Sequence, residues 1–256
     1  MKLALRHTAA LTVRLLRALW RQPWFVGITL VQPMIWLLLF GALFKRVVEI
    51  PGFHGGSYIQ FLTPGIVIMS ALFSAGWHGM ALIDAINRGI MDRFLVSPVS
   101  RGALIVSSAV YGGVVVVVQS LVIFGVAFAV GARFSLVALL VMLGLAVLLG
   151  GAVTGLSNAL ALVARQEETL IGAVQFVVLP ATFLSSGLMA ANLMPHWVQQ
   201  VARFNPVNWA VSAARDVTLA GTDWGSVGIH AGLLAALLVA CTLLATRAFR
   251  VYQRAI

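Results

Sequence analysis

The residue types that usually carry catalysis are few in this 256-residue sequence, and their spacing matches no common reaction site. Its lysines, Lys2 and Lys45, close no G-x-x-x-x-G-K-[ST] loop, so the chain lacks the cradle that holds ATP phosphates. The five histidines form no H-E-x-x-H pair, and no G-x-S-x-G turn presents a serine nucleophile. Cys241 is the single cysteine, which excludes an intrachain disulfide. We therefore predict that this chain is no enzyme and holds no metal.

Neutral polar side chains within long apolar stretches are the second group of candidates. Amides and hydroxyls are costly against lipid, so we expect them to face other helices or a cavity. Two interpretations stay open, because such groups can hold helices together or line the path of a transported molecule. The candidates for a path are Gln32, Ser70, Ser74, Gln119, Asn158 and Gln175. No stretch carries a central carboxylate or lysine for proton coupling, so uphill transport would need energy from a partner.

The elements that position these residues are apolar segments separated by charged connections. The sequence is 61% hydrophobic and 9% charged, with a mean hydropathy of +1.01, which is too apolar to cover a water-soluble fold. Stretches that hold almost no Asp, Glu, Lys or Arg are 25–44, 58–83, 103–130, 134–164, 170–188 and 227–248. Each is about 20 residues or more, which is the length that a helix needs to cross a bilayer. We predict an all-α membrane protein with six transmembrane helices.

The positive charges predict the orientation of these spans. Of the 17 Lys and Arg residues, 12 fall on one side if both termini are cytoplasmic: Lys2, Arg6, Arg14, Arg17, Arg21, Arg88, Arg93, Arg101, Arg165, Arg247, Arg250 and Arg254. Cytoplasmic connections carry an excess of Lys and Arg, so we expect both termini inside. The net charge of +10 is then a sign of topology, since a basic groove with interleaved aromatic residues for nucleic acid is absent.

Two cytoplasmic segments have the pattern of interfacial helices. Residues 1–22 place leucines near one face and arginines largely elsewhere, which is typical of an amphipathic helix on the membrane surface. In residues 84–101, Ile86, Ile90 and Phe94 recur on one face. Arg88, Asp92 and Arg93 lie mostly away from that face, where a partner could dock. A frayed basic tail is the alternative for residues 1–22, and an ordinary solvated loop is the alternative for residues 84–101.

The external connection 189–225 is long, and it holds Pro195, Pro206 and three tryptophans. Tryptophan favours the headgroup level, so we expect this segment to dip back into the membrane. Trp197, Asn205 and Trp209 are predicted to pack against the ends of the fifth and sixth spans as an outer gate, with Asn205 capping the helix that Pro206 begins. Arg215 is expected to reach the surface or to pair with Asp216 or Asp223. Interfacial anchoring alone is the alternative.

Four motifs in a fixed order resemble a known family. Residues 88–101 read RGIMDRFLVSPVSR, 184–188 read LSSGL, 193–197 read LMPHW, and 204–209 read FNPVNW and are followed by Arg215. They are similar to motifs of the type-2 ABC export permeases, the membrane subunits of bacterial drug, antibiotic and polysaccharide exporters of the daunorubicin-resistance type. The resemblance in length, span number and motif order covers essentially the whole chain.

The resemblance implies a dimer with a second copy or a similar permease, bound to separate ATPase subunits that hold ATP and Mg. It implies that residues 84–101 form the coupling helix, contacting the ATPase through Arg88, Asp92 and Arg93. Residues 189–217 would form re-entrant helices at the outer gate, with Trp197, Asn205, Pro206, Trp209 and Arg215. The expected function is export of an amphiphilic drug, antibiotic, lipid or glycan across a bacterial inner membrane. A secondary transporter half or channel without an ATPase is the alternative.

Overall fold

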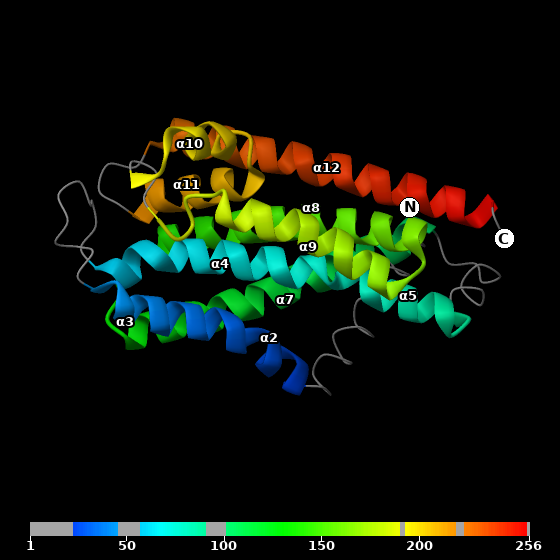
Figure 1. The fold of residues 1–256 in the computed structure, drawn as a ribbon, viewed down its shortest axis with the longest axis horizontal. Helices are drawn as coiled ribbons and strands as arrows, with labels where there is room; N and C mark the ends of the chain where they lie inside the picture. Colours follow the sequence, from blue (N-terminus) through cyan, green and yellow to red (C-terminus); the bar gives the residue numbers. More distant parts are fainter. Residues whose placement is uncertain (1–22, 46–56, 91–100, 190–192, 219–222, 255–256) are drawn as a thin grey trace.

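The computed structural model describes residues 23–45, 57–90, 101–189, 193–218 and 223–254. This part of the chain consists of helices and short connections and contains no β-strand, which confirms the predicted all-α class for it. The longest helices run side by side along the molecule (Figure 1). In chain order the elements are α2 (Pro23–Ile35), the π-helix η1 (Trp36–Phe40), α3 (Gly41–Leu43), α4 (Tyr58–Gly76), α5 (His78–Asn87), α7 (Arg101–Ala129), α8 (Leu136–Ala164), α9 (Glu167–Phe183), α10 (His196–Ala202), α11 (Pro206–Thr218) and α12 (Trp224–Arg254).

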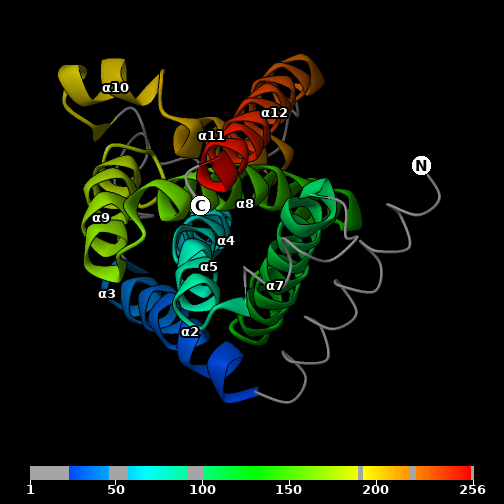
Figure 2. The same ribbon diagram turned by 90° about the vertical axis from the view of Figure 1, so that its right-hand side faces the viewer.

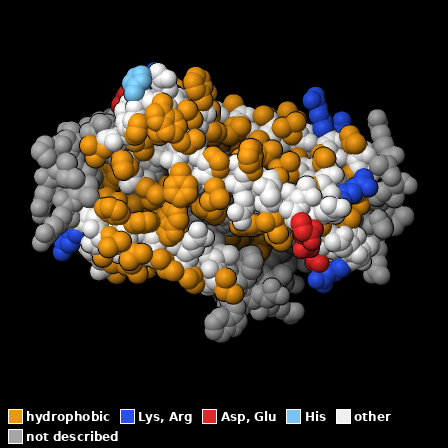
Figure 3. Space-filling view, in the orientation of Figure 1, with side chains coloured by type: hydrophobic (Ala, Val, Ile, Leu, Met, Phe, Trp, Pro, Cys, Tyr) orange, Lys and Arg blue, Asp and Glu red, His pale blue; other side chains and the backbone are white. Residues whose placement is uncertain are grey.

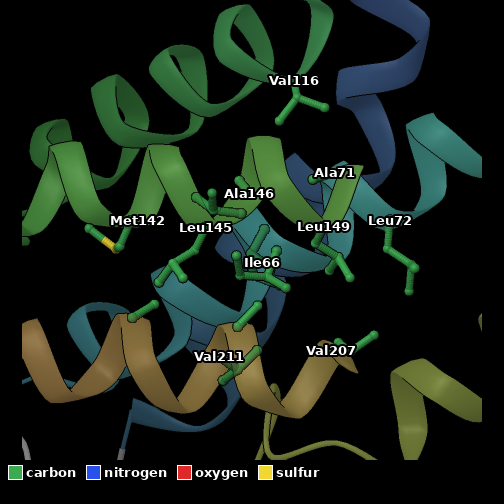
Figure 4. Packing of buried hydrophobic residues seen from close by; sticks show 14 of the residues in the cluster. Ile66, Ala71, Leu72, Val116, Met142, Leu145, Ala146, Leu149, Val207 and Val211 are labelled. Carbon is green, nitrogen blue, oxygen red and sulfur yellow. The ribbon is translucent and has the colours of Figure 1, made fainter. Parts of the chain in front are cut away.

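Helix α4 lies at the centre of the bundle. Viewed along the bundle, α4 and α5 lie among α2, α7, α8 and α9, while α12 lies outside α8 (Figure 2). In the most apolar 18-residue stretch of each segment, 61% of the residues are buried in Tyr58–Asn87, but only 17% are buried in Trp224–Tyr252. Ile66 and Leu72 of α4 pack with Leu145 and Leu149 of α8 and with Val211 of α11 (Figure 4). The buried apolar core is therefore built around α4, whereas α12 lies at the periphery of the bundle.

Four helical segments of the described chain are long and apolar enough to cross a bilayer: Tyr58–Asn87, Ser107–Ala129, Leu136–Ala164 and Trp224–Tyr252. The predicted first stretch, 25–44, is covered by α2, η1 and α3, in which the apolar segment Gly27–Leu43 is shorter. The predicted fifth stretch, 170–188, is helical only to Phe183, and turns follow. The chain is thus a multi-pass membrane protein, and its six-span layout stays a prediction.

The described charges lie toward the two ends of the bundle. Hydrophobic side chains cover the visible face between these ends (Figure 3). We call the end where α5, α8 and α12 finish the basic end, after Arg88, Arg165, Arg247 and Arg250, although Asp84, Glu167 and Glu168 also lie there. Helices α10 and α11 lie at the opposite end (Figure 1). A lipid-facing belt between two polar ends is the surface that a bilayer requires.

The helix of the second predicted span is broken at Trp77. The backbone of Trp77 has φ −81° and ψ −4°, so α4 ends at Gly76 and α5 begins at His78. Helix α5 then continues to Asn87, beyond the predicted end of the stretch at residue 83, and Gly89 follows with φ 64°. Residues 84–87 are therefore the last turn of α5 and no part of a separate coupling helix.

Several predicted features lie outside the described residues. They are the interfacial helix at 1–22, the part of the predicted coupling helix at 91–100 with Asp92 and Arg93, and residues 190–192 and 219–222 of the external connection. Within the described part of that connection, α10 and α11 form the two short helices that the pattern favoured. Their depth in a membrane remains a prediction.

Candidate functional site

Arg215 lies inside the protein, contrary to the prediction that it reaches the surface or pairs with an aspartate. Its side chain is only 7% exposed. The guanidinium donates hydrogen bonds to the carbonyl oxygens of Ser186 and Gly187, the latter at 2.8 Å. Its Nε also approaches the carbonyl oxygen of Phe61 at 3.4 Å, and its Cζ lies 3.7 Å from the centre of the Phe61 ring. The five donors of arginine suit such a set of carbonyls better than a single carboxylate.

Two of the carbonyls that Arg215 binds, those of Ser186 and Gly187, belong to residues 184–188. We call these residues the closure turn, because they follow the end of α9 and lead toward α10. These residues are not helical, so their backbone groups need partners from elsewhere. Asn208 Oδ1 accepts a bond from Ser186 N at 3.0 Å, and the Tyr58 hydroxyl donates to the Leu188 carbonyl at 3.2 Å. Side chains of α4 and α11 thus replace the helical bonds that the turn has lost.

The closure turn touches α4 at a contact between two glycines. A Cβ atom at Gly65 would overlap the carbonyl group of Gly187, and one at Gly187 would overlap the side chain of Met69. The first obstacle is backbone, which cannot move aside as the end of a flexible side chain can. Glycine at both positions is what allows the turn to lie directly on α4.

Asn205 fastens the start of α11 to the end of α9. Its Oδ1 accepts a hydrogen bond from Val207 N at 3.0 Å, so the predicted cap on the helix that Pro206 begins is observed. Its Nδ2 donates to the carbonyl oxygens of Ala181 and Leu184 at 2.7 and 3.0 Å. These two bonds explain why α9 ends before the predicted boundary, since Asn205 supplies partners to carbonyls at the helix end.

The two tryptophans of the predicted gate are placed differently. Trp209 is half-buried against the core, and its Nε1 donates to the carbonyl of Arg203 at 2.6 Å. Trp197 is 61% exposed, so the prediction that it packs against the ends of the spans is wrong. Trp197 and Val201 of α10 and Phe204 just after it are exposed, while Val198 and Ala202 are buried. This arrangement suits a short helix whose apolar face meets lipid.

Three of the predicted path residues line one cavity between α2 and α4. Gln32, Ser70 and Ser74 share the walls of a pocket of about 100 Å³ with Thr29 and with three aromatic side chains. The aromatic walls are Trp36, Phe73 and Trp77. Among the described residues, the side chains of Gln32, Ser70 and Ser74 make no hydrogen bond, so their polar groups are available to a ligand.

The backbone on one side of this pocket is irregular. Pro33, another wall residue, lies inside α2, and the π-helix Trp36–Phe40 follows it directly. Proline removes a helical hydrogen bond, and π-helical turns occur frequently at functional sites. The pocket is thus bordered by a locally rewound helix on one side and by the regular helix α4 on the other.

The remaining path candidates do not join the pocket walls. Gln119 Nε2 donates to Thr29 Oγ1 at 2.9 Å, so Gln119 contacts a residue of the pocket wall without lining the pocket itself. Asn158 Nδ2 donates to Ser108 Oγ at 3.2 Å, which is an interhelical contact between α8 and α7. Gln175 is exposed on α9, away from the pocket. Polar residues in apolar helices therefore either join helices, as Asn158 does, or line a cavity, as Ser70 and Ser74 do, and the role of that cavity as a transport path stays a prediction.

At the basic end, Arg88 follows the last turn of α5. Its Nε lies 2.8 Å from Asp84 Oδ1 in an exposed ion pair across one helical turn. Such a pair adds little stability, so both groups could exchange partners with a docking surface. The described residues hold no group of three His, Cys, Asp or Glu side chains that could bind a metal ion.

The sequence alone did not identify several residues of the closure turn and of the pocket. It did not select Tyr58, Gly65, Asn208 or the aromatic walls Trp36 and Trp77 of the pocket. A signal was present for Asn208, because it lies in the motif FNPVNW. The aromatic walls had no such signal, since aromatic residues are common in apolar helices.

Comparison with known proteins places these features in a family. The model of the ABC-2 type transporter family matches residues 6–219. The transport permease ycf38 of Porphyra purpurea is 30% identical over 230 residues, which cover 86% of this chain and 76% of the relative. The daunorubicin resistance ABC transporter permease protein DrrB1 of Streptomyces coeruleorubidus is 27% identical over 215 residues, covering 80% and 73%. The inner membrane transport permease YadH of Escherichia coli K12 is 27% identical over 196 residues, covering 73% and 74%. The family match spans the closure turn, Asn205, Arg215 and the pocket, and the chain therefore belongs to the ABC-2 type transporter family as a membrane permease subunit.

Proposed function

We propose that this permease works as a dimer, with a second copy or a similar permease, and with separate ATP-binding subunits that supply the energy for export. Two observations support the need for a partner. The sequence has no loop of the P-loop type, and no span carries a central carboxylate or lysine for proton coupling. ATP and Mg would bind to the partner subunits, which lie outside this chain.

The observation that carries the proposal is the pocket between α2 and α4. A cavity walled by Trp36, Phe73 and Trp77 offers aromatic surface, and Gln32, Ser70 and Ser74 offer unpaired amide and hydroxyl groups. None of the described residues that line it is Asp, Glu, Lys or Arg. Such walls suit an amphiphilic molecule that combines an apolar body with hydrogen-bonding groups. The name of the Streptomyces relative, a daunorubicin resistance permease, fits a cargo of this kind.

The cavity volume of about 100 Å³ is small for a whole drug molecule. We infer that the pocket receives one part of the cargo, such as a ring with its polar substituents. The rest would lie in the space that a second permease subunit completes. This assignment makes the pocket a section of the path.

The two ends of the molecule receive different roles in this proposal. The excess of Lys and Arg in the full sequence on the side of both termini supports a cytoplasmic basic end, where Arg88, Asp92 and Arg93 would contact the ATP-binding subunit. The opposite end would then be external, and the closure turn with Asn205, Pro206, Trp209 and Arg215 would close the path there. Trp197 would anchor α10 in the outer leaflet. Both termini would be cytoplasmic, in a bacterial inner membrane.

The experiment is reconstitution of the permease into lipid vesicles with and without its ATP-binding subunit. Daunorubicin and a fluorescent phospholipid serve as probes, and accumulation is measured with ATP, without ATP and with a non-hydrolysable analogue. We expect ATP-dependent movement of at least one probe and a loss of that movement in Ser74→Leu, which fills the pocket.

Thr246→Leu on α12 is the matched control, because among the described residues its hydroxyl bonds only to the carbonyl of Thr242 in its own helix. Equal probe movement with and without the ATP-binding subunit would overturn the proposal in favour of a secondary transporter or channel. Equal transport by the Ser74→Leu and Thr246→Leu variants would remove the pocket from the path.

A further inference from the structure

The break between α4 and α5 is repaired by one side chain from another helix. In a continuous α-helix, Gly79 N–H would bond to the Ala75 carbonyl, and Met80 N–H would bond to the Gly76 carbonyl. Here Met80 N bonds instead to the carbonyl of Trp77 at 3.1 Å. Ser157 of α8 replaces both lost bonds, because its Oγ accepts from Gly79 N at 2.9 Å and donates to the Gly76 carbonyl at 2.5 Å.

This repair takes place within the apolar core. Ser157 is 2% exposed, and the break lies inside the candidate membrane span Tyr58–Asn87. Backbone groups without partners are very costly at membrane depth, so a break is tolerated only where protein groups satisfy it. A single hydroxyl that both donates and accepts does this here, and the Ser157 side chain therefore fixes the position of the break.

Glycines on both sides allow close packing at this point. A Cβ at Gly79 would lie 2.5 Å from the backbone oxygen of Ser157 and 2.8 Å from its Oγ. A Cβ at Gly76 would lie 2.9 Å from Val174 Cγ1 of α9. The backbone of the break thus lies directly against the backbone of α8 and against the Val174 side chain of α9, and any bulk at Gly79 would separate α5 from α8.

The residue at the break is also a wall of the pocket. Trp77 lies between α4 and α5, and its side chain lines the cavity together with Phe73 and Ser74. On the other side of the break, α5 runs ten residues to Asn87 at the basic end, just before Arg88. A change in the angle between α4 and α5 must therefore move Trp77, which lies at the break itself.

We propose that the Ser157-bridged break is a hinge that passes movement of α5 to the pocket wall at Trp77, with Ser157 as its positioning residue. This inference rests on the proposed function, in which the basic end contacts the ATP-binding subunit. Ser157 holds α5 at a defined angle while the Gly76 and Gly79 backbone lets that angle change. The pocket then responds to the ATPase because Trp77 belongs both to the hinge and to the wall.

The decisive variant is Ser157→Ala. It removes both bonds at once, and the least costly way for the chain to satisfy Gly79 N and the Gly76 carbonyl is to restore the continuous helix. We expect α5 to straighten, and we expect the number of probe molecules moved per ATP hydrolysed to fall about tenfold, within the usual range of coupling energies. Ser157→Cys should give an intermediate loss, since a thiol is a weak donor and acceptor.

The matched control is Ser120→Ala. Ser120 is also a buried serine in a long helix, but its hydroxyl donates only to the Val116 carbonyl of its own helix. It should leave coupling unchanged. A second pair of variants tests the packing, because Gly79→Ala collides with α8 and should uncouple transport, whereas Gly144→Ala meets nothing within 4 Å and should not.

The movement of α5 is measured as the distance between spin labels at two exposed positions, Ala81 on α5 and Gly172 on α9, in a Cys241→Ala background. We expect the distance between the labels to change during ATP turnover in the parent protein and to stay fixed in Ser157→Ala. If the parent shows ATP-driven transport while Ser157→Ala couples normally with the same distance change, the hinge is wrong and the proposed function stands. If the parent shows no dependence on ATP, the proposed function fails first.

Discussion

The closure turn and the pocket lie against the same helix, α4, but they differ in whether their polar groups are hydrogen-bonded. At the closure turn, Arg215, Asn205, Asn208 and Tyr58 supply hydrogen bonds to backbone groups that helix geometry no longer satisfies. In the pocket, the side chains of Gln32, Ser70 and Ser74 make no hydrogen bond among the described residues. Satisfied groups hold a structure in place, whereas accessible unsatisfied groups can bind a ligand.

This difference separates two kinds of polar residue that look alike in a membrane sequence. The closure turn should respond to substitution mainly through stability, because each lost side chain leaves buried carbonyls without partners. The pocket should respond mainly through cargo recognition, because nothing in the resting fold depends on its polar groups. Variants ordered by their expected effect on stability test this distinction.

The largest effect is expected for Arg215→Met, which keeps an apolar chain of similar length. The carbonyls of Ser186, Gly187 and Phe61 would lose their donor inside the protein, at a cost of at least about 3 kcal/mol. We expect a clear drop in the thermal unfolding midpoint of the purified protein in detergent. Arg215→Lys should recover only part of this loss, because one ammonium cannot reach all three carbonyls in the arginine geometry. An unchanged midpoint in Arg215→Met would mean that the clamp is dispensable.

Asn205→Leu should come next, because it removes the cap on α11 and both bonds to the end of α9. The expected loss is about 2 kcal/mol. Asn205→Asp is the informative comparison, since its carboxylate can still cap Val207 N but cannot donate to Ala181 and Leu184. Unfolding midpoints should fall in the order parent, Asp variant, Leu variant, and leak of a small dye from vesicles should rise in that order. A midpoint for the Asp variant equal to that of the parent would leave the cap as the only role of Asn205.

Gly65→Ala tests the contact between α4 and the closure turn. Its Cβ would overlap the backbone of Gly187, so the two segments must separate, at a cost of about 1–3 kcal/mol. Gly125→Ala on α7 is the control, because a Cβ there meets nothing within 4 Å and alanine favours a helix. We expect opposite shifts of the unfolding midpoint in the two variants. Equal shifts would show that the glycine contact is not close in solution.

The smallest effect on stability is expected for Gln32→Leu in the pocket. Its amide makes no hydrogen bond among the described residues, so the unfolding free energy should change by less than about 0.5 kcal/mol. The concentration of probe at half-maximal transport should rise, while the maximal rate changes less. Leu43→Val, exposed on α3, serves as the control. Loss of stability without a change in transport would place Gln32 with the structural residues and erase the contrast between the two regions.

Much of the architecture could be predicted from the sequence, because apolar runs and charged connections report directly on the bilayer. The helices, the cap by Asn205 and the family followed from local patterns. The path candidates Gln32, Ser70 and Ser74 were also recognisable as polar residues in apolar helices. That they meet in one cavity while Gln175 faces outward depends on how each helix is rotated about its axis. The sequence of a single helix does not contain this information.

Arg215 shows why the rest could not be predicted. An arginine near the end of an apolar segment usually extends to water, so the surface or a neighbouring aspartate was the reasonable expectation. Its actual partners, the carbonyls of Gly187 and Phe61, lie 28 and 154 residues away in the sequence. The Ser157 bridge has the same character, since it joins α8 to a break 78 and 81 residues away. Backbone acceptors carry no side-chain signature, so sequence patterns cannot identify them.

Thiol reactivity at one position in each region tests the contrast most directly. Single cysteines replace Ser74 in the pocket and Ser186 in the closure turn, each in a Cys241→Ala background, and the rate of labelling by a small membrane-permeant maleimide is measured in vesicles that contain the ATP-binding subunit. Without ATP, the cysteine at position 74 should react faster, because Ser74 lines a cavity and Ser186 is buried beneath Arg215. ATP turnover should change the rate at position 74. Equal rates at the two positions, or faster labelling at position 186 in the resting protein, would contradict a firmly held closure beside an accessible pocket.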